Sequence, residues 1–105
     1  MNFGNSKIRM FLIENGFSVP LDARCNGVSY VLCYDNDFVI SANLAECKMF
    51  AEMPDFEYNK TNRMSPKTRK LNFHWLSSED VDLSIHNIKK FIDRVCEIYE
   101  KKGDI

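Results

Sequence analysis

The most regular hydrophobic pattern in the chain lies near its C-terminal end. Apolar side chains recur there at spacings of three and four residues, at Ile85, Ile88, Ile92, Val95 and Tyr99. Because this spacing brings side chains onto one stripe of an α-helix, the pattern predicts a helix over residues 84–102. A helix of that length extends for about 28 Å.

The N-terminal half of the chain predicts one helix followed by a hairpin. Apolar residues at helical spacing indicate a helix over residues 5–15, and Gly16 suits the left-handed position just past its end. Residues 28–34 alternate in the manner of a strand, and residues 38–40 return as a second strand. The Asp-Asn-Asp sequence at 35–37 is typical of the turn between them.

The middle of the chain has a more ambiguous pattern. Asn43 and Glu46 have the spacing of a capping box, which predicts a helix over residues 44–53. The alternative is that the second strand continues past Ser41. Residues 55–58 are predicted to form a short strand that brings two aromatic side chains to one side.

Together these elements predict the fold class. Residues 71–76 alternate between apolar and polar side chains and indicate a further strand. The hairpins favour an antiparallel or mixed sheet of three to four strands, with helices packed on one face. We therefore expect residues 1–105 to form a single compact α+β domain of two layers, with a long C-terminal helix and a basic loop at 59–70.

Composition supports one folded domain and limits its location. The chain has 105 residues, of which 45% are hydrophobic and 28% are charged. No uninterrupted apolar run approaches the roughly 20 residues of a membrane-spanning helix or the shorter core of a secretory signal. We expect a cytoplasmic protein with no membrane association, whose four cysteines are free thiols.

The net charge of -1 hides an uneven distribution. Residues 59–70 have a charge of +5 and no acidic residue, whereas the stretches on either side are acidic. Such a segment attracts phosphates or an acidic protein surface, although it is also compatible with a solvated polar loop. The candidate partner-binding residues are the cations of this segment and two nearby aromatics: Tyr58, Lys60, Arg63, Lys67, Arg69, Lys70 and Trp75.

The other reactive side chains have no spacing typical of a metal or catalytic site. Zinc ligands usually come in pairs about two to four residues apart, and the cysteines and histidines of this chain do not. We predict no metal, no cofactor and no catalytic residue. A small hydrolase would use His74 with a cysteine or an acid. A nuclease would use the acids that precede the last helix, Glu79, Asp80 and Asp82, together with a further acid and a lysine, for which Asp55, Glu57 and Lys70 are the candidates. No recognised spacing supports either enzyme.

The function that these observations favour is non-catalytic. We expect an intracellular binding protein of the regulator or inhibitor type, which contacts a macromolecular partner through the basic loop 59–70. A protein partner is favoured. Nucleic-acid binding by the same loop and its flanking aromatics is the alternative, and a small hydrolase or nuclease is the second. We expect a monomer, or a homodimer that forms through the C-terminal helix.

Overall fold

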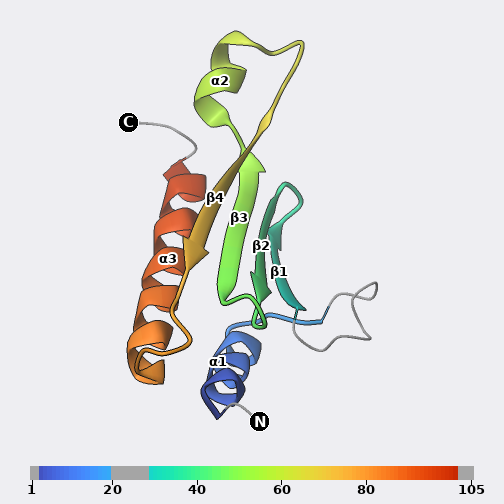
Figure 1. The fold of residues 1–105 in the computed structure, drawn as a ribbon. Helices are drawn as coiled ribbons and strands as arrows, with labels where there is room; N and C mark the ends of the chain where they lie inside the picture. Colours follow the sequence, from blue (N-terminus) through green and yellow to red (C-terminus); the bar gives the residue numbers. More distant parts are fainter. Residues whose placement is uncertain (1–2, 20–28, 102–105) are drawn as a thin grey trace.

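The computed structural model describes residues 3–19 and 29–101 (Figure 1). The prediction that Cys25 is a free thiol therefore lies outside the described residues. The elements in chain order are α1 (Phe3–Glu14), β1 (Ser29–Asp35), β2 (Phe38–Asn43), β3 (Lys48–Pro54), α2 (Phe56–Thr61), β4 (Thr68–His74) and α3 (Val81–Lys101).

The four strands form one antiparallel sheet in the order β1-β2-β3-β4. One face of this sheet is buried, because every second residue of β2 and β3 is enclosed and the residues between them are half-buried or exposed. The helices α1 and α3 share the same hydrophobic core, and α3 runs alongside β4 (Figure 1). The predicted two-layer α+β fold is thus confirmed. The enclosed residues of β2 and β3 are Phe38, Ile40, Ala42, Met49, Ala51 and Met53.

The helix predicted over residues 44–53 is wrong, because most of this segment is β3. The Asn43 side chain accepts the backbone N–H of Glu46 at 3.1 Å and donates to its carboxylate at 3.1 Å. The first of these bonds is the one that a capping box forms from its first residue, but here it closes a turn between two strands. Cys47 ends the turn with a φ of 52°. The alternative interpretation, a second strand that continues past Ser41, is confirmed.

The short strand predicted at residues 55–58 is also wrong. Asp55 is the N-cap of α2, and its carboxylate accepts the backbone N–H of Tyr58 at 3.1 Å. An aspartate in this position favours a helix start because it satisfies a backbone donor that would otherwise have no partner. Phe56 and Tyr58, which have one residue between them, therefore belong to a single helical turn and not to one side of a strand.

The first helix and hairpin match their prediction. Asp35 pairs with Phe38, so that only Asn36 and Asp37 lie between β1 and β2. Gly16 follows α1 with a φ of 93°, a conformation that glycine adopts without strain. In the described part of the chain, no helix has both the length and the apolar character needed to span a membrane.

The hydrophobic stripe of α3 is confirmed. Ile88 and Val95 have exposed fractions of 0% and 1% and belong to the common core. The helix begins at Val81, three residues earlier than predicted, because the Asp80 carboxylate accepts the backbone N–H of Leu83. The stripe packs against the chain's own sheet, and the choice between monomer and homodimer stays a prediction.

Alternating burial in β3 predicts unequal costs for two substitutions in the same strand. Met49→Ala is expected to lower the free energy of unfolding by about 2–5 kcal/mol, because Met49 is 1% exposed and its truncation leaves a cavity. Glu52→Ala, on the exposed face, is expected to change it by less than about 0.5 kcal/mol. Urea denaturation measures both values. Equal losses in the free energy of unfolding would contradict the assignment of these residues to a strand with one buried face.

Candidate functional site

The connection between β3 and β4, residues 55–67, contains the larger part of the basic segment, and we call this connection the tip. The tip projects beyond the end of the sheet (Figure 1). Its base is closed by a backbone bond of 2.9 Å from Asp55 to Lys67, where the β3–β4 ladder ends. The Asn59 side chain then accepts the N–H of Lys67 at 2.9 Å and donates to its carbonyl at 3.1 Å. The predicted loop is therefore a closed and internally bonded structure.

An aromatic contact anchors the tip to the body of the domain. The Phe56 ring at the start of α2 packs against Tyr99 with 5.8 Å between the ring centroids, and Tyr99 stacks on Phe38 at 4.6 Å. The Tyr99 hydroxyl is held between the carboxylates of Asp37 and Asp35. The pKa of Tyr99 is raised above its ordinary value. The largest cause is the hydrogen bond to Asp37, followed by burial and the hydrogen bond to Asp35. The neutral phenol thus fixes the end of α3 to the first hairpin beneath the tip.

The five predicted cations are all exposed, but they do not form one loop. Lys60 is in the last turn of α2, Arg63 and Lys67 are in the connection, and Arg69 and Lys70 belong to β4. Pairing with β3 extends β4 back to Thr68, three residues before the predicted start, and so places these two cations in a strand. The basic segment therefore spans a helix, a loop and a strand.

Two of these cations cover aromatic rings. The Lys67 ammonium lies 4.6 Å from the centroid of the Tyr58 ring, and that of Lys70 lies 4.3 Å from the centroid of Phe50 on the outer face of the sheet. Such cation–π contacts are worth about 0.5–1 kcal/mol at exposed sites. Tyr58 therefore lies close to the basic residues, in α2 and not in the predicted strand, and its ring is already in contact with a lysine.

Trp75 is not brought together with the other predicted residues. Its side chain is 5% exposed and belongs to the core. Its backbone N–H donates to the carbonyl of Cys47, at the end of the β3–β4 ladder opposite the tip. Trp75 was expected beside the basic residues because it is close to them in sequence. The extended strand between them separates them by about 3.3 Å per residue.

Sequence reasoning missed three residues of this surface. Met64 lies in the tip and is 96% exposed, the highest value among the exposed large hydrophobic residues. Lys90 and Arg94 of α3 line a groove of about 350 Å³ with Asn87, Phe91 and Phe73 of β4. Met64 was detectable as the one apolar residue in a polar stretch. The role of the two α3 cations was not, because β4 comes beside them only in the folded chain.

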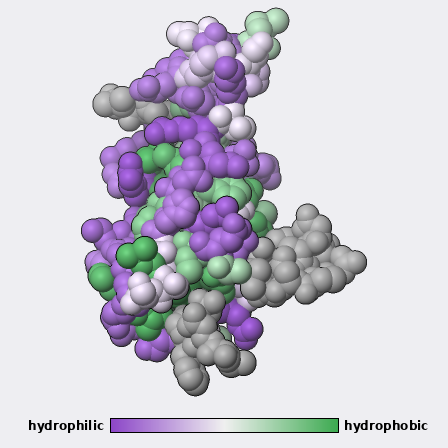
Figure 2. All heavy atoms as spheres, viewed as in Figure 1, coloured by the Kyte–Doolittle hydropathy of each residue, from purple (hydrophilic) through white to green (hydrophobic). Residues whose placement is uncertain are grey.

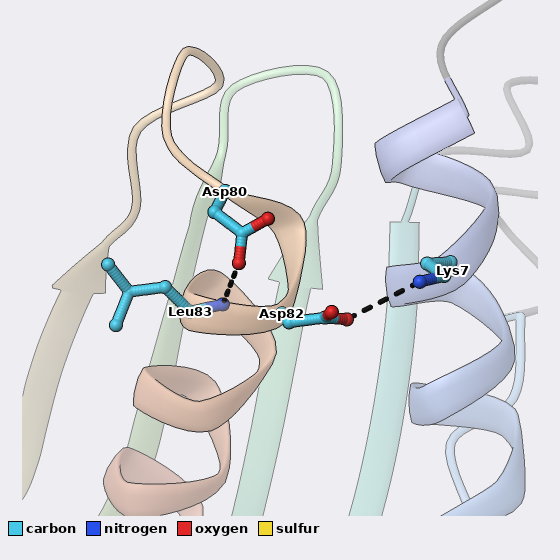
Figure 3. A network of polar contacts seen from close by, with 4 residues as sticks. All are labelled: Lys7, Asp80, Asp82 and Leu83. Atoms are coloured by element: carbon cyan, nitrogen blue, oxygen red, sulfur yellow. Dashed lines mark hydrogen bonds and ion pairs between the residues drawn. The ribbon is translucent and has the colours of Figure 1, made fainter.

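The acidic residues at the start of α3 have structural partners. Asp80 accepts a backbone N–H in the first turn, and Asp82 forms an ion pair with Lys7 of α1 at 3.4 Å (Figure 3). Glu79 accepts the Ser84 hydroxyl at 2.8 Å. Carboxylates in these positions stabilise a helix N-terminus. They join α3 to the loop before it and to α1.

The remaining reactive side chains are dispersed. His74 on β4, His86 on α3 and Cys33 on β1 are exposed, and Cys47 and Cys96 are half-buried. Within residues 3–19 and 29–101, no three or more histidine, cysteine or acidic side chains are placed to hold a metal ion. Asp55, one of the acids considered for a nuclease, is engaged as the cap of α2.

Comparison with known proteins adds no relative. No family model matches the chain, and no curated protein and no solved structure matches it. The surface formed by the tip, β4 and the groove is therefore interpreted from its own residues.

The aromatic cluster beneath the tip predicts a shifted tyrosine titration. Tyr34 donates to Glu100 at 2.6 Å, and this bond raises the pKa of Tyr34 from 10.0 to about 12. The bond requires the neutral phenol, so its contribution to stability is fully present below pH 10 and is lost as the pH rises through about 12. Titration of the ring carbons by NMR measures this pKa.

Two variants test the cause of the shift. Glu100→Gln removes the charge and is expected to return the pKa of Tyr34 toward its ordinary value. Glu97→Gln is the matched control, because Glu97 pairs with Lys101 at 2.7 Å and not with Tyr34. A wild-type Tyr34 that ionises near pH 10 would show that the bond to Glu100 does not form in solution.

Proposed function

We propose that this protein is a non-catalytic binding protein, of the regulator or inhibitor type, whose tip contacts an acidic surface on a protein partner. The observation that carries the proposal is a basic projection with Met64 almost fully exposed at 96%. In Figure 2 the tip, at the top, is mainly hydrophilic, whereas hydrophobic side chains gather on the body below it. The tip is therefore a charged element with a single prominent apolar side chain.

Charge and shape together favour contact with an acidic partner. The tip and the first residues of β4 carry five exposed cations, and Asp55 and Glu57 are the acids closest to them in sequence. Exposed cations on a projecting element accelerate encounter with an acidic surface and set its orientation. A flexible methionine among them adapts to an apolar depression on the partner.

The state of the aromatic rings favours a protein partner over nucleic acid. Single-stranded nucleic acid gains about 1–3 kcal/mol per base by stacking on an accessible aromatic face. Here Lys67 lies over Tyr58, Phe56 packs on Tyr99, and Trp75 is buried. Phosphate attraction remains available to the cations, so nucleic-acid binding stays the alternative. No arrangement of described side chains supports the hydrolase or nuclease hypothesis. The cytoplasmic location stays a prediction.

A tip variant tests the proposed contact. Arg63→Ala, Met64→Ala and Lys67→Ala, combined, are expected to weaken partner capture at least about tenfold, because they remove two cations and the apolar side chain between them. Lys7→Ala, Met10→Ala and Lys89→Ala remove the same kinds of exposed side chain away from the tip and are expected to reduce it by less than about twofold. Capture from an extract of the source cells by immobilised full-length protein, with quantitative mass spectrometry, compares the three forms.

The outcomes separate the alternatives. Unchanged partners in the tip variant would contradict the siting of the contact. Binding of a duplex or single-stranded oligonucleotide at 50 mM salt, with a salt dependence that flattens in a Lys67→Ala, Arg69→Ala, Lys70→Ala variant, would favour nucleic acid in place of a protein.

A further inference from the structure

The hydrogen bonds at the two ends of the β3–β4 ladder determine which residues of β4 face outward. Trp75 donates to Cys47, and Asp55 donates to Lys67. In an antiparallel pair only every second residue bonds to the partner strand. With the observed register, the odd-numbered residues of β4 therefore bond to β3. The even-numbered residues direct their N–H and C=O groups away from the sheet: Thr68, Lys70, Asn72 and His74.

This outer edge of β4 has no strand beside it in the described part of the chain. All four of its outward-directed residues are exposed. The opposite edge of the sheet differs, because Ser18 bridges Val31 of β1 through two backbone bonds of 2.9 and 2.8 Å. The sheet thus has one edge that is partly covered and one that presents about four residues of unused backbone groups.

The groove introduced above lies beside the open edge. Its floor is the stacked pair Phe73 and Phe91, with 5.4 Å between their ring centroids, and its cations are Lys90 and Arg94 of α3. Neither cation forms an ion pair with a described residue. The neighbouring Lys89, in contrast, is paired with Asp93 at 2.9 Å. The groove therefore combines an apolar floor with two positive charges that no described side chain neutralises.

We propose that the edge of β4 accepts an extended acidic segment of the partner protein as a fifth strand. One apolar or aromatic side chain of this segment enters the groove over Phe91, and acidic side chains on the same face of the segment reach Lys90 and Arg94. Strand addition supplies backbone hydrogen bonds, and alternate side chains supply specificity. This inference rests on the proposed function and extends its contact surface from the tip along β4.

The positive charge of β4 distinguishes between the possible partners of its open edge. β4 carries Arg69 and Lys70 and no acid, so two copies of β4 side by side would bring like charges together, which is unfavourable in a strand pair. The same cations attract an acidic strand. A nucleic acid lacks the alternating N–H and C=O groups that the edge presents. An acidic peptide is therefore the partner that satisfies both the backbone groups and the charges.

A defined peptide tests the proposal with the full-length protein. The probe is acetylated and amidated Glu-Thr-Glu-Thr-Phe-Thr-Glu-Thr-Glu, which places phenylalanine between glutamates on one face of a strand. At a concentration ten times its dissociation constant it is expected to slow amide hydrogen exchange at the four outward-directed residues about tenfold. The same peptide with lysine in place of glutamate is expected to leave exchange unchanged.

Two N-methylated forms of the peptide test whether binding uses the backbone. One carries methyl groups on the threonine amides, and the other carries them on the glutamate and phenylalanine amides. Only one set of alternate amides faces β4 in a fifth strand, so one form is expected to lose binding at least about tenfold and the other to retain it. Equal affinity of both forms would overturn strand addition.

Variants of the groove provide the matched comparison. Lys90→Gln with Arg94→Gln is expected to weaken the peptide at least about tenfold, and Lys7→Gln with Lys89→Gln, which removes the same charge elsewhere, less than about twofold. No change in exchange at Thr68, Lys70, Asn72 and His74 with up to millimolar peptide would overturn the inference. The inference would also be overturned if an oligothymidylate protected these amides from exchange and the peptide did not.

The failure of this inference is distinguishable from failure of the proposed function. The tip variant leaves residues 68–74 and the groove intact and is expected to keep the peptide. Loss of partner capture by the tip variant without any peptide binding would leave the proposed function standing and overturn the fifth strand. If the peptide binds and the tip variant captures its partners as well as the wild type does, the fifth strand would stand and the proposed function of the tip would be overturned.

Discussion

The double pairing of β3 is the constraint on which the rest of the structure depends. β3 bonds to β2 on one side and to β4 on the other, and it turns Met49, Ala51 and Met53 into the core. A shift of one residue in either register would expose this buried set, which makes the register strongly specified. The register in turn places the tip at one end of β4 and Trp75 at the other, and it decides which backbone groups of β4 face outward.

Tyr99 connects the tip to this framework. Its ring contacts Phe38 from β2 and Phe56 from α2, and its hydroxyl is satisfied by Asp35 and Asp37 of the first hairpin. One side chain at the end of α3 thus joins three elements that are distant in sequence. An anchored tip loses less conformational freedom when it binds than a free loop of the same composition would.

Two segments that the sequence interpretation assigned wrongly begin with the same kind of local bond. Asn43 accepts the backbone N–H of Glu46, as their spacing predicts, and Asp55 accepts that of Tyr58, which the sequence analysis did not consider. Such a bond satisfies a backbone donor equally well in a strand turn and in a helix start, so it identifies a change of direction without identifying the element that follows. What followed Asn43 was decided by partners on both sides of β3, which lie outside any local window of sequence.

The sequence by itself determined the features that depend on neighbouring residues: the hydrophobic stripe of α3, the position of the turn in the first hairpin, and the concentration of positive charge in residues 59–70. Only the tertiary structure decided that Trp75 is buried, that lysines cover Tyr58 and Phe50, and that Lys90 and Arg94 lie beside the open edge of β4. The reason is that exposure and proximity depend on which distant segments pack together, whereas helical spacing, turn formation and charge are local properties of the chain.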